Sequence, residues 1–159
     1  MNPLCLADPD PVPPSTHIEP ALIAAYRAAH YEVSADASAS LAVPFVLRVD
    51  IASPELLDLY RRHDVSQAAY VTACNPHSTV LSDADNRARM DDLAQTLRAL
   101  AGQGPAHSSV RSYTILHGRG TDPSGAWPGE ASVLVLGMGE TEAREFGTRF
   151  GQNALLHAG

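Results

Sequence analysis

The chain has 159 residues, of which 45% are hydrophobic and 18% charged, so it is long enough for one globular domain with a buried core. Its formal net charge is -7 at pH 7, which argues against non-specific binding to nucleic acid or to an anionic membrane, because both need a basic surface. All eleven basic residues are arginine, and the absence of lysine excludes a P-loop lysine, a pyridoxal Schiff base and a lysine general base. Arginine suits bidentate anion recognition, although a compositional bias toward arginine and alanine would give the same pattern.

Cysteine and histidine usage predicts no disulfide and no metal site, and we expect no cofactor. Cys5 lies in a Pro-rich start and Cys74 ends an apolar run, while the seven histidines include no pair at ligand spacing. No apolar run reaches the roughly 18 residues that a membrane-spanning helix needs, and no signal-like start is present. We therefore expect a cytoplasmic protein.

The first third of the chain is predicted to contain a tail, two helices and two strands. Residues 1–16 hold five prolines and are expected to be a flexible tail, followed by a single domain over residues 17–159. The expected elements are a helix from Ile18 capped by Thr16 with Glu19, a short strand over 31–35, a strand over 43–49 and a helix from Ser53 to His63. Alternation in the 43–49 strand places Val43, Phe45, Leu47 and Val49 on one face and Arg48 on the other.

The remaining chain is predicted to alternate strands and helices. The expected elements are a strand over 67–74, a helix capped by Ser82 and ended by Gly102, a strand over 112–118, a long connection over 118–130, a strand over 132–138, a helix over 141–150 and a strand over 153–157. From residue 68 this is a ferredoxin-like βαββαβ order, preceded by an αββα segment. We expect an α+β sandwich of two or three layers, with a mixed, largely antiparallel sheet and helices mainly on one face.

A polar pair extends the apolar stripe of the long helix toward the start of that helix. Asn86 and Arg89 share helical spacing with Leu93, Leu97 and Leu100, so their side chains should face inward. They line a cavity, or they bind carbonyl groups of the preceding loop and hold it in place. The two interpretations are compatible.

Two connections carry most of the remaining polar candidates. The turn over 75–79 follows the carboxyl end of a strand and precedes a helix start, where anionic ligands are favoured. The 118–130 connection contains Trp127, which either stacks on a ligand ring or plugs the core edge. Glu130 comes directly before an apolar strand, where it is either a general base or the partner of Arg48 or Arg89 in a salt bridge.

Three further side chains have reactive groups but weaker sequence support. Cys74 could be a nucleophile near a helix start, although a cysteine that ends a strand is more often a small buried apolar residue. His77 and His117 could act as acid or base, but no neighbouring residue in the sequence orients either ring.

Six stretches of the sequence resemble the bacterial family called domain of unknown function 3293. They are "FVLRV" (45–49), "YVTACNPHSTVLS" (70–82), "NRAR" (86–89), "GRGTDPSGAWPGE" (118–130), "LVLG" (134–137) and "FGQNALL" (150–156). The resemblance covers most of residues 30–157 and implies that twelve residues belong together: Arg48, Thr72, Asn75, Pro76, Ser78, Asn86, Arg89, Trp127, Pro128, Glu130, Gln152 and Asn153. The family's Asn-Pro motif often follows an aromatic residue, where this chain has Cys74. The family has no assigned activity, so the resemblance groups these residues without giving them a role.

Three functions are compatible with this set. The first is an enzyme for a small anionic or nucleotide-like molecule, with Glu130 and Arg89 catalytic, Arg48, Thr72, Asn75, Ser78, Asn86, Gln152 and Asn153 binding the ligand, and Trp127 covering a ring. The second is a non-catalytic ligand-binding or regulatory module, and the third is a protein-interaction or toxin-related module with an exposed apolar patch. Against all three stands a buried structural network, in which loss of Arg89 would cost several kcal/mol of stability.

Overall fold

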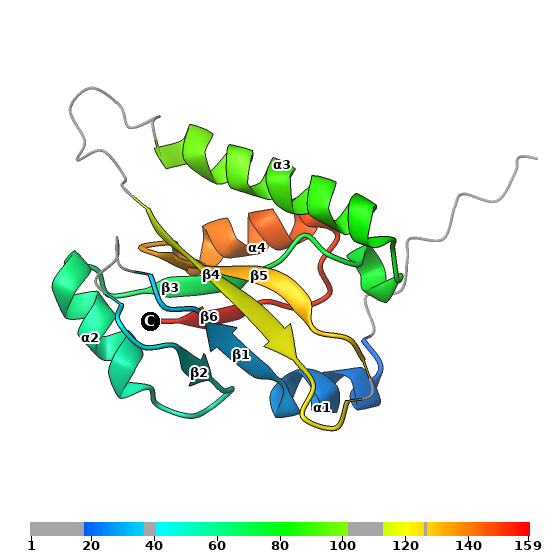
Figure 1. Cartoon of the computed structure of the whole chain (residues 1–159), viewed down its shortest axis with the longest axis horizontal. Coiled ribbons are helices and arrows are strands. Elements are labelled where there is room, and N and C mark those ends of the chain that lie inside the picture. Colours follow the sequence, from blue (N-terminus) through cyan, green and yellow to red (C-terminus); the bar gives the residue numbers. More distant parts are fainter. Residues whose placement is uncertain (1–17, 37–40, 102–112, 126) are drawn as a thin grey trace, which may run out of the picture.

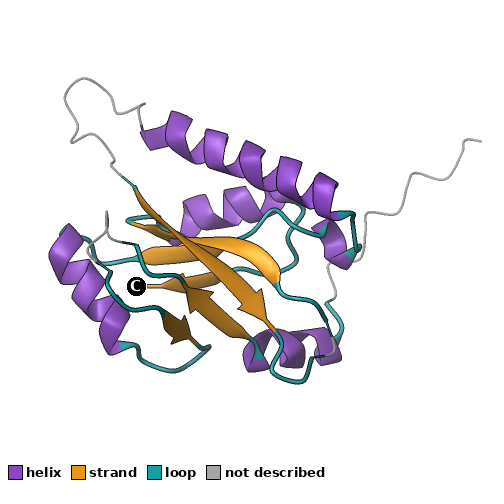
Figure 2. Ribbon diagram, in the orientation of Figure 1, coloured by secondary structure: helices purple, strands orange, loops and turns teal. Residues whose placement is uncertain are grey.

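The computed structural model describes residues 18–36, 41–101, 113–125 and 127–159. Within these ranges the chain forms four α-helices, one short 3-10 helix and six strands that join into a single curled sheet (Figures 1 and 2). The expected tail over 1–16, including Thr16, and the expected helix stop at Gly102 lie outside the described residues. No described helix is both long and apolar enough to cross a membrane.

The elements follow one another in the expected chain order. The helices are α1 (Pro20–Ala28), α2 (Pro54–His63), η1 (Pro76–Ser78, 3-10), α3 (Asp83–Ala101) and α4 (Glu140–Phe150). The strands are β1 (His30–Val33), β2 (Phe45–Leu47), β3 (Ala68–Val71), β4 (Thr114–Thr121), β5 (Glu130–Leu136) and β6 (Leu156–Ala158). The chain therefore has the predicted α+β composition.

The helix caps explain why two of the helices begin where predicted. At α2, Oγ of Ser53 accepts a hydrogen bond from the Leu56 amide at 3.2 Å, and Pro54 occupies the first turn, where its missing N–H costs nothing. At α3, Oγ of Ser82 accepts from the Asp85 amide at 3.1 Å. The capping box expected for α1 is wrong, because Glu19 itself occupies the cap position, makes no side-chain cap bond and is followed by Pro20.

The long connection predicted between the fourth and fifth strands is also wrong. Strand β4 continues to Thr121, and β5 begins at Glu130, so the segment between them is a shorter hairpin loop. The pairing of Gly120 with Glu130 closes this hairpin. The expected strand over 43–49 is likewise shorter, because Val43 is 68% exposed and only Phe45 and Leu47 contribute to the buried face.

The strands lie in the order β2-β1-β4-β5-β3-β6, and every pairing among the described strands is antiparallel. The sheet expected to be mixed is therefore antiparallel in the described part of the chain. The long pairing of β4 with β5 and the pairing of β5 with β3 place β5 and β3 in the interior of the sheet, and β6 forms one edge.

Helices cover both faces of the sheet, which makes three layers rather than a sheet covered mainly on one side. One core joins Leu56 and Leu59 of α2 to the sheet, and a second core on the opposite face joins α3 and α4 to it. Strand β3 supplies both cores by alternation, since Ala68 belongs to the first and Ala69 to the second. Figure 1 shows α3 and α4 on one side of the sheet and α1 and α2 on the other.

Candidate functional site

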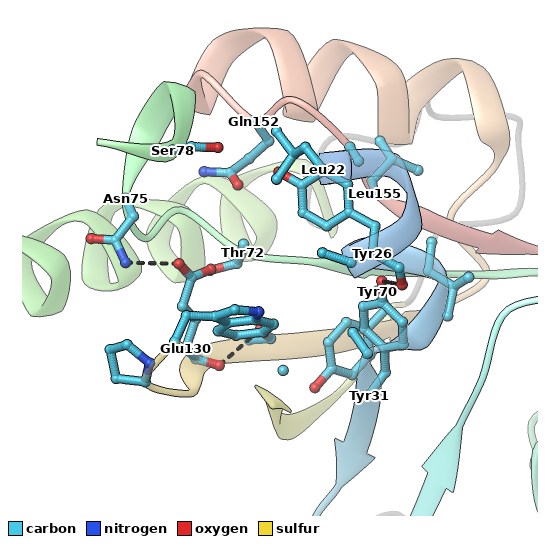
Figure 3. A pocket seen from close by; sticks show the side chains of 18 of the residues that line it. Leu22, Tyr26, Tyr31, Tyr70, Thr72, Asn75, Ser78, Glu130, Gln152 and Leu155 are labelled. Carbon is cyan, nitrogen blue, oxygen red and sulfur yellow. Dashed lines mark hydrogen bonds between the residues drawn. The ribbon is translucent and has the colours of Figure 1, made fainter. Parts of the chain in front are cut away.

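A cavity of about 260 Å³ lies on the same face of the sheet as α2, beside the part that α2 covers. Its floor consists of residues that share one sheet face: Tyr31, Tyr70, Thr72, Gly120, Glu130, Ser132 and Leu156. Alternation explains this set, because every second residue of β3 and β5 points to the same side. Helix α1 forms one wall through Leu22, Ala25 and Tyr26 (Figure 3).

Four aromatic side chains help to line this cavity: Tyr26, Tyr31, Tyr70 and Trp127. The rings of Tyr31 and Tyr70 meet edge to face, with centroids 5.4 Å apart and planes at 75°. The Tyr70 hydroxyl donates to the Glu32 carbonyl at 2.8 Å, and the Tyr31 hydroxyl donates to the Tyr26 carbonyl at 2.8 Å. Burial raises the pKa of Tyr31 to about 12 and raises that of Tyr70 further. Both phenols therefore stay neutral and are fixed in place.

The polar end of the cavity is centred on Asn75. Its Nδ2 donates to Oε1 of Glu130 at 2.7 Å, and its Oδ1 accepts from the Leu81 amide and from Nδ2 of Asn86, both at 2.9 Å. Oδ1 of Asn86 in turn accepts from the Asn75 amide at 2.9 Å. Asn75 thus links the end of β3, the start of α3 and the start of β5.

The turn that carries Asn75 has an unusual backbone. Asn75, His77 and Ser78 all have positive φ, at 45°, 53° and 58°. Asparagine tolerates the left-handed region better than most residues, but three such residues in four positions carry strain, which often marks functional sites. The His77 amide donates to the Gly151 carbonyl at 2.7 Å, so the end of α4 helps to hold the turn.

Glu130 is the one carboxylate among the described lining residues, which include no arginine, lysine or histidine. The side chain is half-buried, and this burial raises the pKa of its carboxyl group, while the hydrogen bond from Asn75 opposes part of that rise. The salt bridge expected between Glu130 and Arg48 or Arg89 is absent from the described residues, and Glu130 accepts a hydrogen bond from Asn75 instead. A carboxylate without a charged partner in a cavity is a candidate for proton transfer or for recognition of a donor.

Thr72 and Cys74 form hydrogen bonds within the protein that stabilise the end of β3. Oγ1 of Thr72 donates to the Ala131 carbonyl at 2.7 Å and accepts from the Cys74 amide at 3.0 Å. The Cys74 thiol is buried, and this burial raises its pKa. The thiol stays protonated, so the structure gives Cys74 no activation as a nucleophile.

The segment after α4 closes the cavity from another side. Gln152 lines it, and its Nε2 donates to the Cys74 carbonyl at 2.9 Å. Ser78 lines the cavity as well, and its Oγ accepts a hydrogen bond from Nδ2 of Asn153 at 2.8 Å. Asn153 itself does not line this cavity. Figure 3 shows Gln152 and Glu130 approaching the same space from different elements.

Two of the arginines expected at the site lie elsewhere. Nε of Arg89 donates to the Ala73 carbonyl and its NH2 group donates to the Phe150 carbonyl, both at 2.6 Å. Arg89 therefore joins the end of β3 to the end of α4, where a cation is also favoured by the helix dipole. Arg48 is exposed just after β2, and neither arginine lines the cavity.

The hairpin loop before β5 adds Trp127 and Pro128 to the lining. Trp127 is half-buried, and its ring approaches Gly120, where a Cβ atom would lie 4.0 Å from it. Trp127 therefore lines the cavity, and its stacking on a ligand ring stays a prediction.

Sequence reasoning missed the aromatic part of the site. Tyr26, Tyr31 and Tyr70 were not candidates, although alternation in β3 places Tyr70 on the same face as Thr72, which was one. Alternation along β5 likewise places Ser132 on the same face as Glu130, so Ser132 could also have been predicted. Tyr31 could not, because its position depends on how β1 pairs with β4.

Fold and site together define an α+β protein with a small cavity on an antiparallel sheet, lined mainly by aliphatic and aromatic residues. The chain belongs to the family described as a protein of unknown function (DUF3293), which matches residues 71–155. No curated protein and no solved structure matches the chain. The matched segment contains Thr72, Asn75, Glu130 and Gln152, whereas Tyr31 lies outside it.

Proposed function

We propose that this protein is an enzyme that binds a small organic molecule in the cavity and acts on it through the carboxylate of Glu130. The observation that carries this proposal is the position of Glu130, which is half-buried in a cavity, has a raised pKa and is held by Asn75 at 2.7 Å. A general base works best when its pKa is shifted toward the pH at which it operates. Glu130 would accept the proton on Oε2, and Asn75 would position the group through Oε1.

The size of the cavity limits the ligand. Ligand pockets usually have volumes of about 300–1,000 Å³, so 260 Å³ suits a molecule smaller than most drugs. Tyr31, Tyr70 and Trp127 provide surfaces for a planar or hydrocarbon part. A nucleobase-like ring fits this description, but the expected anion does not rest on Arg48 or Arg89, since both lie outside the lining.

A second candidate is a non-catalytic ligand-binding module. It is favoured by the lack of a histidine in the described lining and by the protonated state of Cys74, which leave Glu130 without an activated nucleophile beside it. Under this alternative, Glu130 would only accept a hydrogen bond from the ligand.

The proposal is tested by a panel of small metabolites in a thermal-unfolding assay. A ligand at about 100 times its Kd should stabilise the fold by about 2.7 kcal/mol. Ala25→Phe, which fills the cavity from α1, should remove the shift, whereas Ala88→Phe at an exposed position on α3 should keep it. A hit that Ala25→Phe does not affect would place binding elsewhere and refute the proposal.

Turnover separates the two candidates. Each hit is incubated with the protein and its products are sought by mass spectrometry. Glu130→Gln keeps the shape of the side chain and should abolish turnover even at saturating ligand. Saturable binding without any product would favour the non-catalytic module.

We also infer a ferredoxin-like arrangement for residues 68–158. The element order β3-α3-β4-β5-α4-β6 and the sheet order β4-β5-β3-β6 support it. In solution, cross-strand NMR contacts should join Tyr70 both to Leu134 and to Leu156. Absence of either contact would contradict the arrangement.

A further inference from the structure

The hydrogen-bond donors of the cavity are mostly used within the protein. Six side chains of its lining donate to protein acceptors: Tyr31, Tyr70, Thr72, Asn75, Ser132 and Gln152. Two acceptors of the lining, Oε2 of Glu130 and Oε1 of Gln152, receive no hydrogen bond from the described residues. Three other lining groups, the hydroxyls of Tyr26 and Ser78 and the indole N–H of Trp127, donate to no acceptor among the described residues. At the end of the cavity formed by Glu130 and Gln152, the free groups are acceptors, so a ligand bound there must supply donors.

The charge of the lining points in the same direction. Glu130 provides a negative charge, and no described lining residue is a lysine, arginine or histidine. Arg87 and Arg119 line an adjoining cavity that shares Asn75, Val80, Pro128 and Glu130 with the first. Both arginines are exposed, and neither forms an ion pair with Glu130 among the described residues. A cation from the ligand would therefore be the missing partner of this carboxylate.

The aromatic rings complete the argument. Tyr26, Tyr31, Tyr70 and Trp127 all line the cavity, and the faces of such rings attract cations. Phosphate or carboxylate groups would meet these rings and Glu130 without any basic residue of the lining to bind them.

We infer that the cavity takes a small organic ammonium, with its positive charge at Glu130 and Gln152 and its hydrocarbon or ring part against the tyrosines and Trp127. This inference rests on the proposed function, because it names the ligand class of the same cavity. The ammonium N–H groups donate to the two free acceptors, and the uncharged part covers the floor of the sheet.

The inference is tested with three probes that share a phenylethyl frame but differ in charge. 2-Phenylethylamine is a cation at neutral pH, 2-phenylethanol is neutral and phenylacetate is an anion. Calorimetry or ligand-observed NMR should show that the cation binds at least about tenfold more tightly than the alcohol, since an ion pair and cation–π contacts are both lost in the neutral compound. Phenylacetate should bind more weakly than either.

Two variants locate the effect at the carboxylate. Glu130→Gln removes the charge but keeps the shape, and it should reduce the preference for the cation over the alcohol to about twofold or less. Asp92→Asn removes one charge from an exposed position on α3 that lines neither this cavity nor the one beside Arg87 and Arg119, and it should leave the preference unchanged.

Each result has a defined consequence. Equal binding of amine and alcohol, tighter binding of phenylacetate, a preference that survives Glu130→Gln, or no binding of any probe overturns the ammonium inference. None of these results removes the proposed small-molecule function. Its binding part fails if Ala25→Phe leaves the shifts of the metabolite panel intact, and its catalytic part fails if no hit is turned over.

Discussion

Arg89 offers the sharpest test of how the polar residues of this protein divide between structure and ligand binding. Its guanidinium donates to the carbonyls of Ala73 and Phe150, both at 2.6 Å, and so joins the end of β3 to the end of α4. Arg89→Ala removes both donors. The Ala73 carbonyl then loses a charged partner, while the Phe150 carbonyl keeps a longer hydrogen bond from Gln152 at 3.4 Å.

The size of the loss follows from these contacts. Hydrogen bonds to charged groups contribute about 1.5–3 kcal/mol each, and the partial replacement at Phe150 lowers the sum to about 2–4 kcal/mol. For a chain of this length each kcal/mol shifts the melting temperature by about 2–4 °C, so Arg89→Ala should melt about 5–15 °C lower. If Arg89 instead faced a solvated ligand site, its removal would cost little.

The assay is urea unfolding followed by circular dichroism, with Arg87→Ala as the matched control. Arg87 lies on the same helix, is exposed, and makes none of the hydrogen bonds described for Arg89, so its replacement should change the free energy of unfolding by less than about 0.5 kcal/mol. A loss for Arg89→Ala that equals that of Arg87→Ala would refute the structural role.

Three further predictions concern the sheet, a helix cap and pH. Gly118→Ala should destabilise the fold by more than about 2 kcal/mol, because the new Cβ would lie 2.6 Å from the Tyr70 hydroxyl and would also clash with the main chain. Gly120→Ala should cost far less, because its Cβ would have its nearest neighbour at 3.9 Å. Equal melting temperatures of the two variants would contradict this prediction. Ser53→Ala should cost about 1 kcal/mol in urea unfolding through loss of the α2 cap, and Ser53→Thr should recover most of it. Because burial raises the pKa of the Glu130 carboxyl in the folded protein, the fold binds this proton more tightly than the unfolded chain, so the contribution of Glu130 to stability falls as pH rises from the ordinary glutamate pKa through the raised one. The free energy of unfolding of Glu130→Gln minus that of wild type should therefore increase with pH over that window, and a difference that stays flat would contradict the raised pKa.

Local sequence patterns were enough to predict the helices and most strands. Ser53-Pro54-Glu55 and Ser82 with Asp85 act within a few residues of each other, so capping chemistry is visible in the sequence. The end of β4 was predicted to be part of a loop because Gly118 and Gly120 flank Arg119, and segments with several glycines are usually loops. Only the pairing of that segment with β5, which a local pattern does not encode, makes it a strand.

The cavity could be predicted only in part, because its parts meet through tertiary structure. Helical spacing correctly placed Asn86 and Arg89 on the inner side of α3, and carbonyl groups of the preceding loop were one expected set of partners. The sequence could not show that Asn86 pairs with Asn75, or that Arg89 also binds the Phe150 carbonyl at the end of α4. The aromatic floor depends on sheet order, which brings Tyr31 of β1 and Tyr70 of β3 to an edge-to-face contact from strands that are not neighbours.

The hydrogen bonds of the site distinguish polar residues that stabilise the fold from polar residues that are available to a ligand. Asn75 uses both ends of its side-chain amide within the protein, and Thr72 both donates and accepts there. Replacing either residue would therefore change the structure of the turn, and would affect a ligand only through that change. Glu130 differs, because one oxygen is fixed by Asn75 while the other receives no bond from the described residues. A rigid frame that leaves one acceptor free orients that acceptor without occupying it. Variants at Asn75 should therefore change stability and ligand affinity together, whereas Glu130→Gln should change ligand preference and leave the frame intact.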